Sequence, residues 1–438
     1  MKHIINFSLI NLGCTKNLVD SQYFLGRLFD MSLKTPEYQL NYFTDPFDIQ
    51  TNIVFLNTCA FISSGRDEAS ETVKKLFKAK KTVYLLGCAV QYYKKLTKDQ
   101  GIKNVHYLSR GDLNKVNLKN IMQGYDSTRY GDFEFASSPR VYTNLEQKFE
   151  YLKIAEGCDN HCTFCIIPAI RGKQQSLTIE KILAEAKNMI ANGIKEIILI
   201  AQDTTRYGTD LYGEPKLLEL LKKLDAIKGD FTYRLLYLYP DIVTLNQVKA
   251  LKKLKKFIPY FDIPLQHISS PVLKNMGRFY DEGYIIQFID QIKKIFPVRF
   301  IRTNLIIGFP GETKEDFDKL VSFVDDTKFD NIALFEYHDE PMAASSKLKN
   351  KVDDHEIRTR FTKLRQLVNK QLLESENARK GNEETGYIME IEKGILVVRP
   401  QLHCPEIDAY DEITVKQVIG TFEDKDILDI GDKITYKV

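Results

Sequence analysis

The chain has 438 residues, of which 43% are hydrophobic and 28% are charged, so it carries enough apolar side chains to build folded cores and is not a disordered protein. Its 62 basic and 59 acidic residues leave a net charge of only +3, which neither requires nor excludes a nucleic acid as a partner. The sequence shows no uninterrupted apolar run of about 18 residues and no signal-peptide pattern, so we expect a cytoplasmic protein without a membrane span.

We expect residues 2–118 to form a first domain built on a parallel sheet. The apolar runs INFSLINLGC, NIVFLNTC and TVYLLGC are typical of short strands, and amphipathic segments separate them. Strands that alternate with helices favour parallel pairing, and strands that are apolar throughout fit a sheet covered on both faces, an α/β sandwich. Residues 119–143 are polar and contain Gly and Ser, which predicts a linker.

A longer alternation of strands and helices occupies residues 144–373. The candidate strands are YLKIAEG, EIILIAQ, YRLLYLYP, FDIPLQH, IRTNLIIGFPGE and NIALFEYH. Helical patterns separate them, and a long charged helical segment, HEIRTRFTKLRQLVNKQLLESENARK, follows the last one. Six strand–helix units predict a partial (β/α)6 barrel, since a complete barrel of this kind has eight.

The last 64 residues, 375–438, predict a small all-β domain. ETGYIMEIEKGILVVRPQ, EITVKQVIG and DKITYKV alternate like strands. From Gly381 onward the chain has thirteen acidic and six basic residues, a net charge of −7, so the rest of the chain carries +10.

Three cysteines, Cys158, Cys162 and Cys165, form a C-x3-C-x2-C motif directly after the first strand of the barrel. A zinc site that adds His161 is one interpretation, but His161 directly precedes Cys162, which makes a shared tetrahedron awkward. Three thiolates can instead hold three irons of a [4Fe–4S] cluster, which usually takes four cysteines. The fourth iron is then open to bind S-adenosylmethionine (SAM) and cleave it.

Three further cysteines, Cys14, Cys59 and Cys88, each follow one apolar run of the first domain. They are widely spaced, and three half-buried thiols in a sheet are one interpretation. However, the carboxyl ends of parallel strands meet at one edge of a sheet, where open α/β sheets bind ligands. The three thiols can therefore converge on a second cluster with one open iron. Cys404 is left over and is expected to be an ordinary thiol.

Polar or glycine residues also follow several barrel strands, where the active sites of (β/α) barrels lie. They are Gln202 and Asp203, Gln266 and His267, Arg302, and the turn Gly308-Phe309-Pro310-Gly311-Glu312. A capping or turn role is at least as plausible for any one of them. Phe164, inside the cysteine loop, has two interpretations, contact with an adenine or plain packing, and we favour the first.

These motifs together resemble the radical SAM methylthiotransferases over nearly the whole chain. GCTKNLVDSQ, NTCAFI and GCAVQ resemble the cysteine contexts of that family, and the tail resembles its TRAM domain, an OB-like β-barrel. EGCDNHCTFCIIPAIRG, LIAQDTTRYGTDLYG, PLQHIS, IRTNLIIGFPGET and CPEID resemble the bacterial enzymes that methylthiolate an aspartate of ribosomal protein S12. The chain departs from that pattern at Gln22, at Cys404 and in FEYHDEPMAASS, none of which touches the six cysteines.

The resemblance implies two [4Fe–4S] clusters, on Cys158, Cys162 and Cys165 and on Cys14, Cys59 and Cys88. It also implies two SAM molecules per turnover. One yields a 5′-deoxyadenosyl radical that removes a hydrogen atom from the aspartate β-carbon, and the other methylates the sulfur that is transferred. Phe164, Ile306 and Gly308 match positions that contact the adenosyl group, and Gln202 is a candidate of the same kind. A low-potential electron donor and a sulfur donor of unspecified identity are implied as partners.

Two alternatives are a related enzyme that methylthiolates a tRNA adenosine and a non-catalytic scaffold that binds zinc. An RNA-binding tail is expected to be basic, because neutralisation of phosphates dominates RNA affinity. The acidic tail instead suits a basic ribosomal protein, so direct RNA binding is not favoured.

Overall fold

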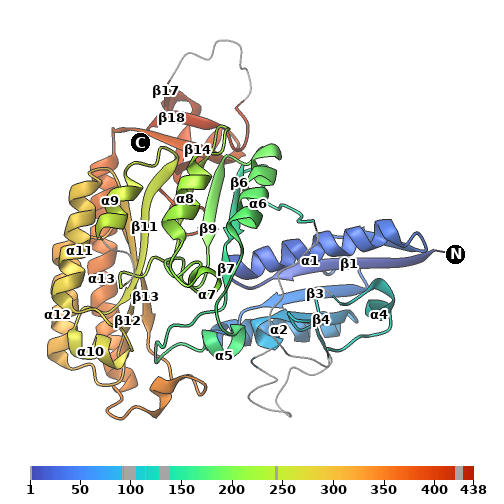
Figure 1. Ribbon diagram of the computed structural model, residues 1–438, viewed down its shortest axis with the longest axis horizontal. Coiled ribbons are helices and arrows are strands. Elements are labelled where there is room, and N and C mark those ends of the chain that lie inside the picture. Colours follow the sequence, from blue (N-terminus) through green and yellow to red (C-terminus); the bar gives the residue numbers. More distant parts are fainter. Residues whose placement is uncertain are drawn as a thin grey trace.

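The computed structural model describes residues 2–90, 92, 105–113, 115–127, 139–241, 245–419 and 428–438. Three main sheets follow one another along the chain (Figure 1), as the sequence predicts. The N-terminal sheet lies beside the first strand of the central barrel, and the C-terminal sheet covers one end of the barrel strands. The cysteine loop and helix α5 (Ile167–Arg171) lie at the other end, between the barrel and the N-terminal sheet.

The N-terminal sheet is parallel, with strand order β2-β1-β3-β4-β5. Its strands are β1 (His3–Asn11), β2 (Tyr38–Tyr42), β3 (Ile53–Thr58), β4 (Thr82–Gly87) and β5 (His106–Tyr107), and its helices include α1 (Thr15–Lys34), α2 (Ser63–Lys78) and α4 (Leu118–Met122). All six residues of β3 are buried, and apolar clusters cover both faces of the sheet. The prediction of a parallel sheet covered on both faces is confirmed. The edge strand β2 is not among the predicted strands, because it is only half buried and its pattern YQLNY is weakly apolar.

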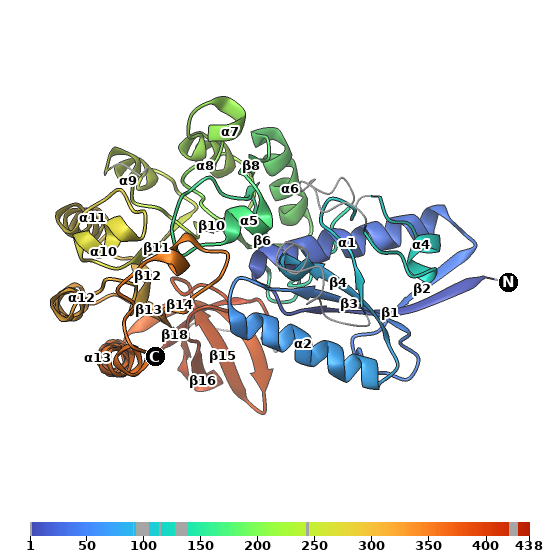
Figure 2. The same ribbon diagram turned by 90° about the horizontal axis from the view of Figure 1, so that it is seen from below.

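The central sheet has six parallel strands in the order β13-β12-β11-β10-β9-β6, which confirms the predicted partial barrel. The strands are β6 (Phe149–Lys153), β9 (Glu196–Ile200), β10 (Thr232–Leu235), β11 (Phe257–Gln266), β12 (Phe300–Ile307) and β13 (Asn331–Glu336). The helices α6 (Ile179–Ala191), α8 (Leu217–Asp225), α9 (Leu245–Leu251), α11 (Glu282–Ile295), α12 (Lys314–Thr327) and α13 (Asp354–Arg379) form an arc around its convex face (Figure 2). Short elements follow or join the strands: β7 (Ala155–Glu156), β8 (Gln175–Ser176), α7 (Thr209–Tyr212) and α10 (Ser270–Asn275).

The C-terminal sheet is antiparallel, with strand order β16-β15-β14-β18-β17. Its strands are β14 (Glu383–Glu392), β15 (Ile395–Pro400), β16 (Asp411–Thr414), β17 (Val418–Ile419) and β18 (Lys433–Lys437). The predicted all-β tail is therefore confirmed as a curled sheet. The predicted boundary at residues 373–375 falls inside α13. In the predicted linker, α4 takes up residues 119–122, and residues 128–138 lie outside the described part of the chain.

The concave face of the barrel is filled partly by the C-terminal domain. Cys404 is fully buried in one cluster with apolar side chains of the barrel strands, among them Tyr151, Tyr260 and Phe300. Helices bury one side of the barrel strands, and the residues around Cys404 bury the other. This explains why the sequences of these strands are continuously apolar. Cys404 is a packed core thiol, as the sequence suggests, and its burial raises the pKa of that thiol above its ordinary value.

A buried ion triad fastens the C-terminal domain to the barrel. Glu196, at the start of β9, accepts hydrogen bonds from Arg234 Nε at 2.6 Å and from Arg399 Nη2 at 2.7 Å. Burial would raise the pKa of Glu196, but the two guanidinium groups lower it more, so the pKa lies below its ordinary value. Arg234 also donates to the carbonyl oxygens of Gln401 and Leu402.

Glu196→Gln is expected to destabilise the protein by about 3–5 kcal/mol, because it leaves two buried guanidinium groups without a carboxylate. Because the folded pKa of Glu196 is lowered, its stabilisation is complete above the ordinary glutamate pKa of about 4.3 and is lost as the pH falls through the folded value. Denaturant unfolding at pH 7 checks the size of the effect, and a series that continues to about pH 3 checks its sign. Glu71→Gln, at an exposed carboxylate on α2, is the matched control and is expected to change little.

Candidate functional site

The three N-terminal cysteines lie at the carboxyl ends of adjacent strands. Cys14 follows β1, and Cys59 and Cys88 directly follow β3 and β4. The side chain of Asn17 lies between two of them, since its Oδ1 is 3.8 Å from Cys14 Sγ and 3.9 Å from Cys88 Sγ. Burial, and after it the neighbouring thiols of Cys88 and Cys14, raise the pKa of Cys59. The structure therefore brings these three thiols together at one sheet edge.

The other three cysteines lie in the loop between β7 and α5. Burial raises the pKa of Cys158 and of Cys165 to about 12, and the thiol of Cys162 contributes to both shifts. The backbone N–H of Asn160 points at Cys158 Sγ at 3.5 Å, and that of Ile167 points at Cys165 Sγ at 3.4 Å. Such donors stabilise the thiolate form that iron requires. The donor set of this loop fits an iron–sulfur cluster.

Within the ranges that the structure describes, no three His, Cys, Asp or Glu side chains are grouped as ligands of one metal ion. Each thiolate of an iron–sulfur cube holds its own iron, so the ligands of a cube are spread more widely than those of a single ion. His161, the fourth ligand of the zinc interpretation, is exposed. The ligand role of the six cysteines stays a prediction.

A neighbouring turn supports the cysteine loop from the barrel side. The backbone N–H of Thr163 donates to the carbonyl oxygen of Met276 at 3.0 Å, and its hydroxyl donates to that of Asn275 at 2.8 Å. Gly277 then passes so close to the loop that a Cβ there would lie 2.6 Å from the carbonyl oxygen of His161. The φ of Gly277 is +73°, which also favours glycine.

Gly277→Ala is expected to displace the cysteine loop, because both the contact with His161 and the positive φ oppose a side chain. We expect lower iron content after anaerobic reconstitution and a lower midpoint of thermal unfolding. Gly283→Ala is the matched control, since its Cβ would have no neighbour closer than 3.6 Å and helix α11 favours alanine over glycine. Equal iron content and equal midpoints for the two variants would contradict this account of the loop.

The residues predicted to contact the adenosyl group are placed in two groups. Phe164 and Ile306 pack against one apolar cluster, which contains Phe309. Gly308 follows β12 with a φ of +80°, and its N–H donates to Glu312 Oε2 at 2.8 Å. Gln202 belongs elsewhere, because its amide donates to Glu156 Oε1 at 2.8 Å. The contact of these residues with SAM stays a prediction.

Three buried residues near the cysteine loop have contacts that the sequence does not predict. Glu312 and Asp203 are candidates from the sequence without a specific role, and Arg278 is not among those candidates. Glu312 accepts a hydrogen bond from Arg360 Nη1 at 2.7 Å, which holds the glycine turn in place. Asp203 accepts one from Asn160 of the cysteine loop at 2.8 Å. Arg278 is buried, and its charge faces Cys162 and the phenols of Tyr239 and Tyr280.

A buried network at Glu156 joins the N-terminal domain to the barrel. Its carboxylate receives Arg171 Nη1 at 2.7 Å, Arg110 Nη2 at 2.8 Å and Lys153 Nζ at 2.9 Å. Burial opposes ionisation of Glu156, but the three cations outweigh it and hold its pKa well below the ordinary value. Sequence patterns gave no signal for this network, because its members come from segments far apart in the chain.

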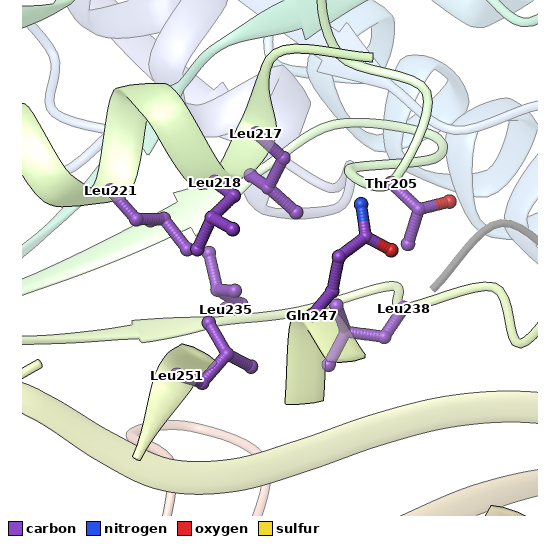
Figure 3. Close-up of a pocket in the computed structure, with 8 residues that line it drawn as sticks. All are labelled: Thr205, Leu217, Leu218, Leu221, Leu235, Leu238, Gln247 and Leu251. Carbon is purple, nitrogen blue, oxygen red and sulfur yellow. The ribbon is translucent and has the colours of Figure 1, made fainter. Parts of the chain in front are cut away.

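One apolar pocket lies beside the barrel, between α8, β10 and α9 (Figure 3). Its empty space, open solvent included, is about 340 Å³, and six leucines together with Thr205 and Gln247 line it. None of the six predicted cluster ligands is among the lining residues.

The fold and the cysteine loop define the class of protein. Residues 152–324 match the radical SAM superfamily, and residues 6–107 match a family described as uncharacterized protein family UPF0004. The radical SAM methyltransferase TsrM from Kitasatospora setae is similar in structure, with a TM-score of 0.57 at 12% identity over 79% of this chain and 74% of that one. The radical SAM enzyme OxsB gives a TM-score of 0.51 at 12% identity over 85% of this chain and 56% of that one. At these identities the likeness concerns the fold.

Relatives of similar length identify the family. The chain is 38% identical to the ribosomal protein uS12 methylthiotransferase RimO of Alkaliphilus oremlandii over 96% of this chain and 95% of that one. It is 34% identical to RimO of Dictyoglomus thermophilum over 98% and 96%, and 33% identical to RimO of Clostridioides difficile over 99% and 96%. The chain belongs to the family of ribosomal protein uS12 methylthiotransferases. It is a radical SAM methylthiotransferase, and the superfamily's cofactors are a [4Fe–4S] cluster and SAM. No helix among the described residues is both long and apolar enough to cross a membrane.

Proposed function

We propose that the protein transfers a methylthio group to the β-carbon of an aspartate in ribosomal protein S12. The observation that carries this proposal is that the two cysteine trios lie at one domain boundary, one at the edge of the N-terminal sheet and one in the loop before α5, whose Arg171 contacts Cys88. The names of relatives at 33–38% identity supply the substrate.

Two [4Fe–4S] clusters and two SAM molecules per turnover form the proposed cofactor set. Cys158, Cys162 and Cys165 hold one cluster, and Cys14, Cys59 and Cys88 hold the other. When bound, these groups supply the radical and sulfur chemistry that acid–base side chains cannot perform on an unactivated C–H bond.

The protein residues bind and orient these cofactors. Phe164, Ile306 and Gly308 are proposed to contact the adenosyl group. Phe164 and Ile306 pack against the same apolar cluster, and Gly308 directly follows β12, the strand that contains Ile306. Gln202, held by Glu156, is proposed to lie at the boundary of this site. A low-potential reductant and a sulfur donor complete the reaction, which is proposed to take place in the cytoplasm.

Charge favours the S12 protein over tRNA as substrate. Residues 381–438 carry a net charge of −7, which suits a basic protein and opposes a phosphate backbone. Incubating the reconstituted enzyme separately with S12 and with tRNA, with SAM and reductant present, tests this choice. A methylthio mass increment on an aspartate of S12 is expected, and an increment on tRNA alone would overturn the assignment.

Metal analysis of anaerobically purified protein separates an enzyme from a scaffold. About eight irons with matching sulfide per chain are expected for two [4Fe–4S] clusters. One or two zincs per chain without sulfide would instead favour a non-catalytic scaffold.

A further inference from the structure

Arg171 connects the two cysteine sites. It is the last residue of α5, six positions after Cys165, and it is buried. Its Nε lies 3.2 Å from Cys88 Sγ, across the boundary with the N-terminal domain. Its Nη1 donates to Glu156 Oε1 at 2.7 Å, and its Nη2 donates to Asn17 Oδ1. Every nitrogen of this guanidinium therefore has a different partner.

Those partners fix the direction of the Arg171 Nε–H bond. Asn17 is itself bound, since its amide donates to the carbonyl oxygen of Thr58 at 2.7 Å and to Asn57 Oδ1 at 3.1 Å. Glu156 lies two residues before Cys158 and is held by Lys153 as well as by Arg171. A planar guanidinium held at two nitrogens cannot rotate away from its third contact, so the donor to Cys88 is rigid.

We propose that Arg171 is a positioning residue for the second cluster. Its guanidinium donates a charge-assisted hydrogen bond to the iron-bound sulfur of Cys88 and raises the reduction potential of that cluster. This inference rests on the proposed function, because it requires a cluster on Cys14, Cys59 and Cys88. Hydrogen bonds and positive charge at a cluster sulfur stabilise the reduced form, which is the more negative one.

The position of Arg171 makes the two sites interdependent. The segment that starts with Cys158 and ends with Arg171 carries all three thiols of one site and the donor to the other. A shift of this loop therefore changes the hydrogen bond to Cys88. The N-terminal domain contributes the thiol, the barrel contributes the guanidinium, and the contact forms only when the two domains are docked.

The test uses the full chain with Cys158, Cys162 and Cys165 replaced by alanine, so that only the second cluster is assembled. In this background Arg171→Met is compared with Arg171→Lys. Stepwise anaerobic reduction with dithionite and redox mediators, followed by electron paramagnetic resonance, gives the midpoint potential. We expect a lower midpoint for Arg171→Met and an intermediate one for Arg171→Lys, which keeps the charge but not the three-way geometry.

Arg234→Met in the same background is the matched control, because it removes another buried arginine from an ion pair and contacts neither cysteine site. It is expected to leave the midpoint unchanged. If Arg171→Met fails to bind iron, the test rests on the midpoint potential of Arg171→Lys compared with that of the protein that keeps Arg171.

The possible failures are distinguishable. Absence of any cluster in the alanine background with Arg171 intact would contradict the proposed second cluster itself. A cluster that forms with the same midpoint and the same resonance spectrum in the intact, Arg171→Met and Arg171→Lys proteins would instead show that Arg171 only joins the domains, and would overturn this inference.

Discussion

Replacing Cys162 with alanine is expected to reduce the formation of 5′-deoxyadenosine from SAM to background. Cys162 lies in the middle of the cysteine loop, and its thiol influences the pKa of both neighbouring cysteines. Without it, two thiolates remain for a cluster that needs three protein ligands to leave one iron for SAM. Chromatography of an anaerobic reaction with SAM and dithionite measures the product.

Cys404→Ala is the matched control for this loss. Cys404 is a buried thiol outside both trios, so its removal is expected to lower stability but to leave the iron content and the 5′-deoxyadenosine yield intact. Equal yields from the wild-type protein and the Cys162→Ala variant would contradict the role of the loop.

Cys59→Ala is expected to have a different profile, with 5′-deoxyadenosine still formed in part and no methylthio group transferred to S12. Cys59 directly follows strand β3 of the N-terminal sheet, and the cysteine loop of the barrel has its own supports at Met276 and Asn275. Loss of one N-terminal thiol therefore leaves the site of SAM cleavage folded. Mass spectrometry of S12 and quantification of 5′-deoxyadenosine in one reaction give both readouts.

Two outcomes would contradict this division of labour. Transfer to S12 by the Cys59→Ala variant at the wild-type level would mean that the N-terminal trio is not needed. Loss of 5′-deoxyadenosine to the same background as in Cys162→Ala would mean that the two trios do not act separately.

The sheets and the convergence of the N-terminal thiols could be predicted because they follow from local patterns. Continuous apolar runs at regular spacing indicate parallel strands, and the rule that such strands end at one edge brings Cys14, Cys59 and Cys88 together. Nothing beyond run length and alternation was needed. The half-exposed strand β2 was missed because its residues carry no such run.

The contacts around the sites could not be predicted, because they join residues far apart in sequence. Arg171 meets Cys88 across 83 positions, and Arg399 meets Glu196 across 203. The sequence does not distinguish a buried arginine from an exposed one, because only tertiary packing determines whether its side chain is buried. The same holds for Arg278, whose burial beside the cysteine loop has no signature in the sequence around it.

The filling of the barrel's concave face by residues near Cys404 bears on how the chain folds during synthesis. The contact of Tyr151 with Glu406 spans 255 positions, so this face of the sheet stays uncovered until residue 406 has left the ribosome. A nascent chain halted before residue 399 therefore exposes apolar surface on the barrel strands, and chaperones are expected to retain it.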